Sequence, residues 1–489
     1  MNSPGQGRGI GMTWVTMALL TTAAVASIRV LPAMAPYGLA SIFMYVLPAI
    51  VFLVPVALVA AELASGWNGG VFGWVRAAYG DRLGFLAIWQ QWMSVVVWFP
   101  AQLAFFAGAL AYVFQPSLAA NGLFVGSTIL IVYWIATMIS LRGMSYTAFV
   151  GSKGLVIGTL VPAAMLVVMA IIYLADGGQS QLQTGSVSDY LPAFTGIASI
   201  VLIVSNFLAY AGMEVNAVHV PDMINPRKGF PKSIGLASIL ILLVFIPPTL
   251  AIAVGVPAAG IDLTTGVMQA FDAFFDRVGI PWGTSAMGLL IVVGILASVV
   301  TWIPGPSRGL LLVARSGYLP RALQKTNGAG VQVNILIVQG ILVSILALFF
   351  AVIPDVNSAF WILTAIAVQL DMIMYMILFM TALKLRRTQP EVPRGFRAPA
   401  MRLVGWVGFS ASLLAFVIGF FHLPGSPMNN VVHISLLLLG IVILGGGPLL
   451  FCRFRKSSWD TSNDCVRTTD ESAGSTAVPG HIGTNPMGS

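Results

Sequence analysis

The chain of 489 residues is far too apolar for a soluble protein: hydrophobic residues make up 58% of it, 8% are charged, and the mean hydropathy is +0.92. A soluble domain carries about a quarter charged residues, so the composition excludes that class and predicts a protein embedded in a lipid bilayer. The formal charge of +8 does not indicate a nucleic-acid partner, because the basic residues are spread over short stretches between apolar runs. Two cysteines, Cys452 and Cys465, cannot form a disulfide framework.

Twelve apolar runs follow one another along the chain. A hydrocarbon core about 30 Å thick needs about 20 helical residues for each crossing, and a segment in lipid satisfies its own backbone as a helix. The sequence therefore predicts an all-α membrane protein with about twelve transmembrane helices. We expect the spans at residues 11–36, 40–65, 83–113, 122–141, 147–174, 194–222, 232–256, 284–314, 331–353, 358–385, 402–423 and 430–452.

The basic residues predict the orientation of these spans. Twelve crossings place both termini on one side, and 22 of the 24 Lys and Arg residues then lie on that side, with Arg277 opposite and Arg29 inside a span. This asymmetry predicts cytoplasmic termini for a multi-pass protein of the cell membrane. The stretch from Arg8 to Ala26 resembles a cleaved secretory signal, but cleavage would reverse the asymmetry. The polar tail, residues 456–489, is expected to be disordered.

The first and sixth spans contain residues that interrupt a helix. The first carries Ser27, Ile28 and Arg29 shortly before Pro32, and the sixth carries Gly212 among polar residues. Proline removes a backbone donor, and freed backbone at membrane depth is tolerated only where it lines a cavity or is buried in protein. Interruptions at matching positions of two halves indicate the central site of a transporter.

Two loops of similar sequence indicate an internal repeat. Residues 70–84, after the second span, and 266–279, after the seventh, share an initial Gly-Val, a central Ala and a final Asp-Arg-x-Gly when one gap is allowed. The predicted topology places the two loops on opposite faces of the membrane, which is what an inverted repeat requires.

Three longer motifs resemble a known family. They are residues 55–75 (P…AAELA…GGVFGWV), 210–226 (YAGME…HVPDM…NP) and 294–309 (GIL…WIPGPSRG). With them the chain resembles the amino acid–polyamine–organocation transporters, and within these the bacterial glutamate/GABA antiporters, from about residue 11 to 455. The family implies alternating access around a midplane site, broken helices 1 and 6, and an inverted five-plus-five helix repeat with two additional helices. The implied divisions are a cytoplasmic N-terminus at 1–10, repeats at 11–193 and 194–385, two further helices at 386–455, and the tail at 456–489.

The resemblance also implies substrate-facing residues. Carried over by position, these are Tyr210, Glu214, Trp302 and Tyr375. Three positions depart from the antiporter, because Arg29, Ser298 and Asp371 stand where it has a tyrosine, a glutamate and a tyrosine. The full predicted substrate site is Ser27, Ile28, Arg29, Tyr210, Ala211, Gly212, Glu214, Ser298, Trp302, Asp371 and Tyr375. The departures change the charge of the pocket and leave the amino acid or amine open.

The charged residues within the spans allow two interpretations. A charge at membrane depth costs about 2.5–3.5 kcal/mol on insertion scales, so each one needs a reason. In the first interpretation, Arg29 binds a substrate carboxylate, while an acidic residue binds a substrate amine or carries a proton. In the second, Arg29 forms a permanent ion pair with Glu214 or Asp371. Free N–H groups near 27–29 and 211–213 would add donors for a carboxylate.

Lys153 and His219 are candidates for proton coupling. Lys153 lies in the cytoplasmic third of the fifth span, where some proton-coupled relatives place a lysine. A buried lysine can lose its proton, which would allow proton coupling. The alternative is that Lys153 anchors its helix at the inner face of the membrane. His219 is expected to pack or to form hydrogen bonds, with proton linkage as the alternative. Trp98 and Gln369 are weaker candidates for the site.

The predicted function is secondary transport of an amino acid substrate or related amine, without a cofactor, and most simply by antiport. Proton symport and uniport stay open, as do acidic, neutral and cationic substrates. A membrane-embedded enzyme is disfavoured because the four histidines are scattered with no metal-ligand spacing. There is no phosphate-binding loop for ATP-driven pumping, and no repeated pore-lining segment for a channel.

Overall fold

The computed structural model describes residues 13–182, 186–194, 196, 201–217, 223–353, 355–421 and 429–459. These residues form helices and connecting segments and contain no β-strand, so the predicted all-α class is confirmed. Ten helical stretches among them are long and apolar enough to cross a membrane. Arg8, His219, Cys465 and nearly all of the predicted tail lie outside the described residues.

The ten stretches correspond to predicted spans two to five and seven to twelve. The run predicted as the first span is divided: α1 ends at Val25, and helix resumes at Ile28 and continues with the second span to Gly66. The described part of the predicted sixth span is the shorter apolar segment Val201–Val215. The difference between twelve and ten therefore arises at the two runs whose residues interrupt a helix.

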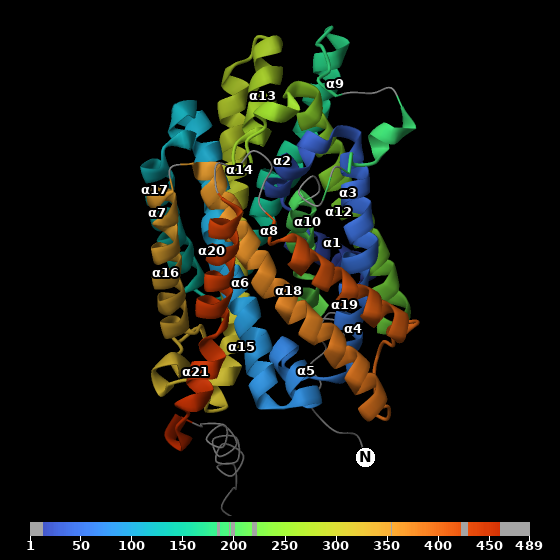
Figure 1. Cartoon of the computed structure of the whole chain (residues 1–489), viewed down its shortest axis with the longest axis vertical. Coiled ribbons are helices and arrows are strands. Elements are labelled where there is room, and N and C mark those ends of the chain that lie inside the picture. The colour runs from blue at the N-terminus through green and yellow to red at the C-terminus, as the bar shows by residue number, and fades with distance from the viewer. Residues whose placement is uncertain are drawn as a thin grey trace, which may run out of the picture.

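The first half of the chain forms an elongated bundle with the second (Figure 1). Its main helices are α1 (Trp14–Val25), α2 (Leu31–Met34), α3 (Ser41–Pro48), α4 (Val54–Gly66), α5 (Gly70–Tyr79), α6 (Asp81–Phe114), α7 (Gly122–Ser140), α8 (Met144–Leu155) and α9 (Val161–Ala175), with the short helical turns η1 (Ile28–Val30) and η2 (Ala35–Ala40) on either side of α2. A π-helical turn precedes Pro55 and another precedes Pro162. Each wider turn accommodates a proline, which has no N–H and clashes with the preceding turn of an α-helix.

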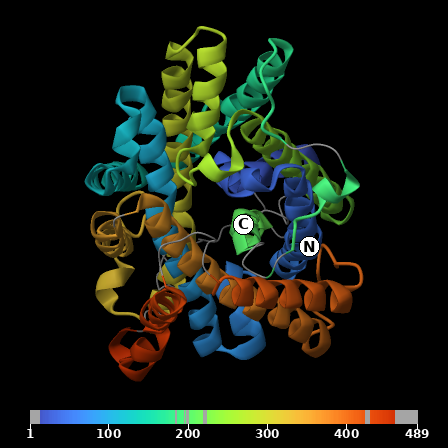
Figure 2. The same cartoon turned by 45° about the horizontal axis from the view of Figure 1, so that its top comes forward.

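The second half supplies the remaining helices. They are α10 (Val204–Ala209), α11 (Met213–Ala217), α12 (Pro226–Gly255), α13 (Gly266–Arg277), α14 (Trp282–Trp302), α15 (Pro304–Arg315), α16 (Val333–Ala347), α17 (Phe349–Val352), α18 (Val356–Thr388), α19 (Met401–Ile418), α20 (Asn430–Gly445) and α21 (Gly447–Arg453). In Figure 2, helices from early, middle and late parts of the chain surround one central region.

The long helices α6 and α18 pack along each other and are the most buried of the candidate spans. Because both helices are largely covered by protein, the polar residues near their middle face other helices and not lipid. The two similar loops, 70–84 and 266–279, both contain a short helix, α5 and α13, and these two helices lie at opposite ends of the bundle (Figure 1).

Candidate functional site

A cavity lies where the interruptions of the first and sixth predicted spans meet. It encloses about 620 Å³ of space not filled by atoms, part of it open to solvent. Its walls come from residues 24–27, 29 and 30, one face of α6, the turn between α10 and α11, α14 and α18. The cavity brings together residues that the sequence places more than 300 positions apart.

The first interruption leaves two backbone donors without partners among the described residues. After α1 ends, Ala26 and Ser27 are extended, with φ/ψ of −67°/116° and −141°/126°. The N–H of Ala26 still bonds to Thr22, at 2.7 Å, and the Ser27 hydroxyl accepts from the N–H of Arg29 at 3.4 Å. In the described part of the chain, the N–H groups of Ser27 and Ile28 donate no hydrogen bond.

Arg29 lies at the cavity with an unpaired charge. It is 4% exposed, and its guanidinium forms no hydrogen bond and lies within 4.0 Å of no carboxylate oxygen of the described residues. Its neighbours are the rings of Phe360 and Trp98, whose centroids are 5.4 and 6.0 Å from the guanidinium carbon. The rings offer cation–π contacts. The permanent ion pair with Glu214 or Asp371 is therefore not formed.

The second interruption is built on Gly212. Its φ of 102° is disfavoured for other residues, and a Cβ atom there would meet the Trp302 ring at 2.5 Å. Its N–H donates to Glu214 Oε2 at 3.1 Å and to the Tyr375 hydroxyl at 3.0 Å, while the N–H of Ala211 donates to Leu208 at 3.2 Å. The expectation of free donors at Ala211 and Gly212 is therefore wrong.

Glu214 is held in place by neighbouring side chains. Oε1 accepts from Gln91 Nε2 at 2.8 Å, and Oε2 accepts from the Tyr375 hydroxyl at 2.7 Å as well as from Gly212. Three donors thus satisfy much of its capacity as an acceptor. Glu214 lines the cavity with a fixed orientation, and Tyr375 contacts it from behind without lining the cavity.

Asp371 supplies a second carboxylate to the cavity. It is 5% exposed and lies beside Ser94 of α6. Within the described ranges, no Lys or Arg nitrogen lies within 4.0 Å of Asp371 or Glu214. One basic and two acidic side chains therefore line a single cavity, with no ion pair among them.

Trp302 and Trp98 form an aromatic part of the wall, with ring centroids 6.0 Å apart, and Ser298 lines the cavity one turn before Trp302. The structure places Ile28 and Tyr210 elsewhere. Ile28 is buried outside the lining.

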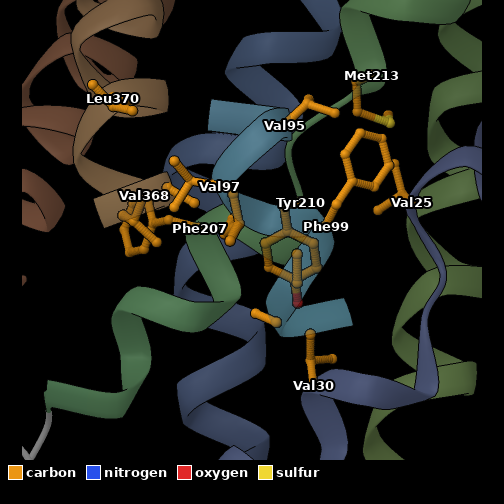
Figure 3. Close-up of a cluster of buried hydrophobic side chains, with 14 of the residues drawn as sticks. Val25, Val30, Val95, Val97, Phe99, Phe207, Tyr210, Met213, Val368 and Leu370 are labelled. Atoms are coloured by element: carbon orange, nitrogen blue, oxygen red, sulfur yellow. The ribbon is translucent and has the colours of Figure 1, made fainter. Parts of the chain in front are cut away.

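Tyr210 packs into the apolar core. Its ring lies among apolar side chains that include Val30 and Phe99 (Figure 3), and its hydroxyl donates to the carbonyl of Tyr45 at 2.9 Å. The residue preceding the glycine turn therefore anchors the end of α10 and does not line the cavity. Gln369 is also not part of the lining, because its amide donates to the carbonyl of Phe416.

Sequence reasoning missed Gln91 and Ser94 as lining residues. Together with Val95 and Trp98 they occupy one face of α6, at intervals of three, four and seven residues from Gln91. That spacing marks one side of a helix. A polar stripe within a buried span was the signal that could have found them.

Lys153 does not line the cavity. It is exposed on α8, a helix that packs against α14. Its proposed part in proton coupling stays a prediction.

A second buried charge cluster lies at the end of α4. Glu62 is 2% exposed and pairs with Arg386, at 2.6 Å, and with Arg394, at 2.9 Å. It also accepts from the N–H of Ala398 at 2.8 Å. This cluster, the Glu62 cluster, ties α4 to the segment between α18 and α19.

Comparison with known proteins gives the family. Residues 12–444, nearly the whole helical part of the chain, match the family described as Amino acid permease. The chain belongs to this family. The permease is thus a multi-pass membrane transporter and not an enzyme, and the predicted membership in the amino acid–polyamine–organocation superfamily is confirmed.

Individual relatives cover most of the permease. An uncharacterised transporter of Legionella pneumophila is 34% identical over 88% of this chain and 93% of its own length. A glutamate/gamma-aminobutyrate antiporter of Lactococcus lactis is 30% identical over 88% of each chain. A probable agmatine/putrescine antiporter of the same species is 25% identical over 74% of this chain and 77% of its own length.

Proposed function

We propose that the permease carries zwitterionic amino acids with small or apolar side chains, by alternating access around the described cavity. The observation that carries this proposal is the unpaired guanidinium of Arg29. A buried charge is costly unless a partner satisfies it. The carboxylate of a bound substrate is a partner of the right charge.

The substrate carboxylate is placed against Arg29 and the adjacent free backbone. Charge-assisted hydrogen bonds from a guanidinium to a carboxylate are stronger than neutral ones. The N–H group of Ser27, which has no partner among the described residues, adds a donor beside Arg29. On the other side of the substrate, the ammonium group is placed against Asp371, because three donors already hold the Glu214 carboxylate.

The rest of the wall suits a neutral substrate side chain. It is mostly apolar and includes Val25, Val95, Trp98, Leu208 and Trp302. A second substrate carboxylate would come close to the acidic residues, and a diamine would bring no carboxylate to Arg29. The charges of the cavity therefore favour a zwitterion over an acidic amino acid or a diamine.

The transport cycle is proposed to use twelve spans, with the interrupted first and sixth spans at its centre. The extended Ala26–Ser27, the Gly212 turn, and the location of α5 and α13 at opposite ends support broken helices and an inverted repeat of 11–193 and 194–385. The distribution of basic residues supports cytoplasmic termini in the cell membrane.

Single cysteines test this topology in a chain without Cys452 and Cys465. Ser180→Cys precedes the sixth span, and Asn327→Cys precedes the ninth. A membrane-impermeant maleimide added to intact cells should label position 180 and spare position 327. The reverse pattern, or labelling of both, contradicts the orientation.

Exchange is the proposed mode of transport, because two of the relatives are named as antiporters. Proton symport and uniport are the alternatives. Proteoliposomes preloaded with an unlabelled amino acid should take up labelled substrate faster than empty ones. Equal rates with and without internal substrate favour the alternatives, and uptake driven by an imposed pH gradient into empty vesicles identifies symport.

A panel of internal amino acids in this counterflow assay tests the substrate class. Neutral apolar amino acids should support exchange, whereas glutamate and putrescine should support it poorly. The Arg277→Ala variant is a suitable control, since Arg277 forms an exposed ion pair with Asp176. Exchange of putrescine at the rate of the best amino acid would overturn the proposed class.

A further inference from the structure

A groove separate from the central cavity lies between the start of α6 and the end of α21. It encloses about 990 Å³ of space that is largely open to the surroundings. Its walls include Tyr79, Arg82, Leu83, Leu86, Leu449 and Arg453. None of these residues lines the cavity around Arg29.

The groove carries positive charge that the described protein does not neutralise. Arg82 and Arg453 are exposed, and neither forms an ion pair with a residue in the described ranges. The adjacent carboxylate, Asp81, is already paired with Arg76 at 2.6 Å and accepts from the Tyr318 hydroxyl at 3.2 Å. Among the described residues, no carboxylate therefore competes with an external anion for the two arginines.

Apolar and basic side chains share one face of each helix. Arg82 and Leu86 are four residues apart on α6, and Leu449 and Arg453 are four apart on α21, so each pair projects from the same side. Because α6 begins at Asp81 and α21 ends at Arg453, the arginines lie near the ends of the helices and the leucines lie further along them. Leu449 is 75% exposed.

We propose that this groove binds an anionic phospholipid. The arginines contact its phosphate-bearing headgroup, and Leu86 and Leu449 contact the first part of an acyl chain. Basic pockets between transmembrane helices recognise anionic headgroups in this way. The site is independent of the proposed transport function, because it uses no residue of the central cavity. Lipid bound there bridges α21 and α6, the helix that carries Gln91 and Trp98.

Native mass spectrometry of the full-length protein in detergent tests the proposal with two added lipids, phosphatidylglycerol and phosphatidylcholine. The wild type should retain phosphatidylglycerol in preference. A basic residue at a membrane surface contributes about fivefold to such binding, so Arg82→Gln together with Arg453→Gln should weaken it roughly thirtyfold. Arg308→Gln together with Arg402→Gln removes the same charge elsewhere and should leave the preference unchanged.

Two results overturn the proposal. The first is equal retention of both lipids by the wild type, a measurement that needs no variant to fold. The second is an equal loss of phosphatidylglycerol in the groove variant and in the matched control, which would show that net charge alone attracts the lipid.

Discussion

The Glu62 cluster and the Arg29 cavity are both buried charge sites in an apolar protein, yet they are satisfied in opposite ways. Glu62 pairs with two arginines and accepts a backbone N–H, whereas Arg29 pairs with no described carboxylate although it is buried to a similar degree. Buried charges are tolerated when they are paired and hydrogen-bonded. The comparison teaches that the charges of the Glu62 cluster are satisfied within the protein, whereas the cavity holds a buried arginine with no partner among the described residues.

The two sites also differ in what they join. The Glu62 cluster holds a connecting segment against the end of α4, and Trp67 reinforces it by donating to Gln389 at 2.9 Å and by lying 4.9 Å from the Arg394 guanidinium. The cavity lies at two turns where the backbone leaves helical geometry. Substitutions should therefore affect folding stability at the first site and substrate binding at the second.

The largest effect on stability is expected from Arg394→Ala. It leaves the buried Glu62 with one of its two arginine partners, and breaking a buried pair costs about 3–5 kcal/mol. Thermal unfolding in detergent should show a much lower midpoint, with little change in substrate affinity of the folded fraction. Arg397→Ala is the control, because that side chain is exposed. An unchanged midpoint would contradict the structural role.

The largest effect on binding is expected from Arg29→Ala. Loss of a charge-assisted contact worth about 3 kcal/mol lowers substrate affinity roughly a hundredfold. The unfolding midpoint should not fall, because no described partner is left unpaired. Arg29→Lys keeps the charge but loses the planar fork, and should retain part of the affinity. Calorimetric titration and counterflow measure both variants; wild-type affinity in Arg29→Ala excludes the carboxylate contact.

A smaller and more selective effect is expected from Asp371→Asn. The variant removes the charge placed against the substrate ammonium, which should cost about 2 kcal/mol, or about thirtyfold in affinity. The loss should be confined to ligands with an amine. A carboxylic acid that lacks the amine should bind wild type and variant with similar affinity, and an equal loss for both ligands assigns Asp371 a purely structural role.

The smallest effect is expected from Gln91→Met, which removes the donor to Glu214 Oε1 while keeping a similar volume. Glu214 keeps the bonds from Tyr375 and Gly212. Gln91 itself lines the cavity beside Glu214, so the substrate affinity should fall by about tenfold at most, the size of one ordinary hydrogen bond. Gln369→Met is the matched control outside the cavity. If the two variants behave alike, Gln91 does not position the carboxylate.

The sequence predicted the helical class and the extent of most spans, because apolar runs of sufficient length leave the backbone no other structure in lipid. It also predicted the cavity at Arg29 and Gly212, since a charge and a helix-breaking residue are costly at that depth. It could not predict which acceptor takes the Gly212 N–H, because this depends on the local path of the turn. The pairing of Glu62 with Arg394, 332 positions apart, depends on tertiary packing.

Side-chain direction was the weakest part of the sequence prediction. Tyr210 and Tyr375 were placed at the substrate by resemblance, but the rotation of each helix aims one into the core and the other at Glu214. Gln91 shows the opposite error, because its place on a polar stripe of α6 went unused. Residue type indicates that a site exists, and the packing of helices decides which atoms face it.

The most direct test of the unpaired Arg29 is the affinity ratio between an amino acid and the amine formed by its decarboxylation, measured in the wild type and in Arg29→Ala. We predict that the wild type binds the amino acid at least about a hundredfold more tightly than the amine, and that most of this preference is lost in the variant, where only backbone N–H groups remain to receive the carboxylate. A ratio that stays high in Arg29→Ala would contradict the account, because another group would then be receiving the carboxylate.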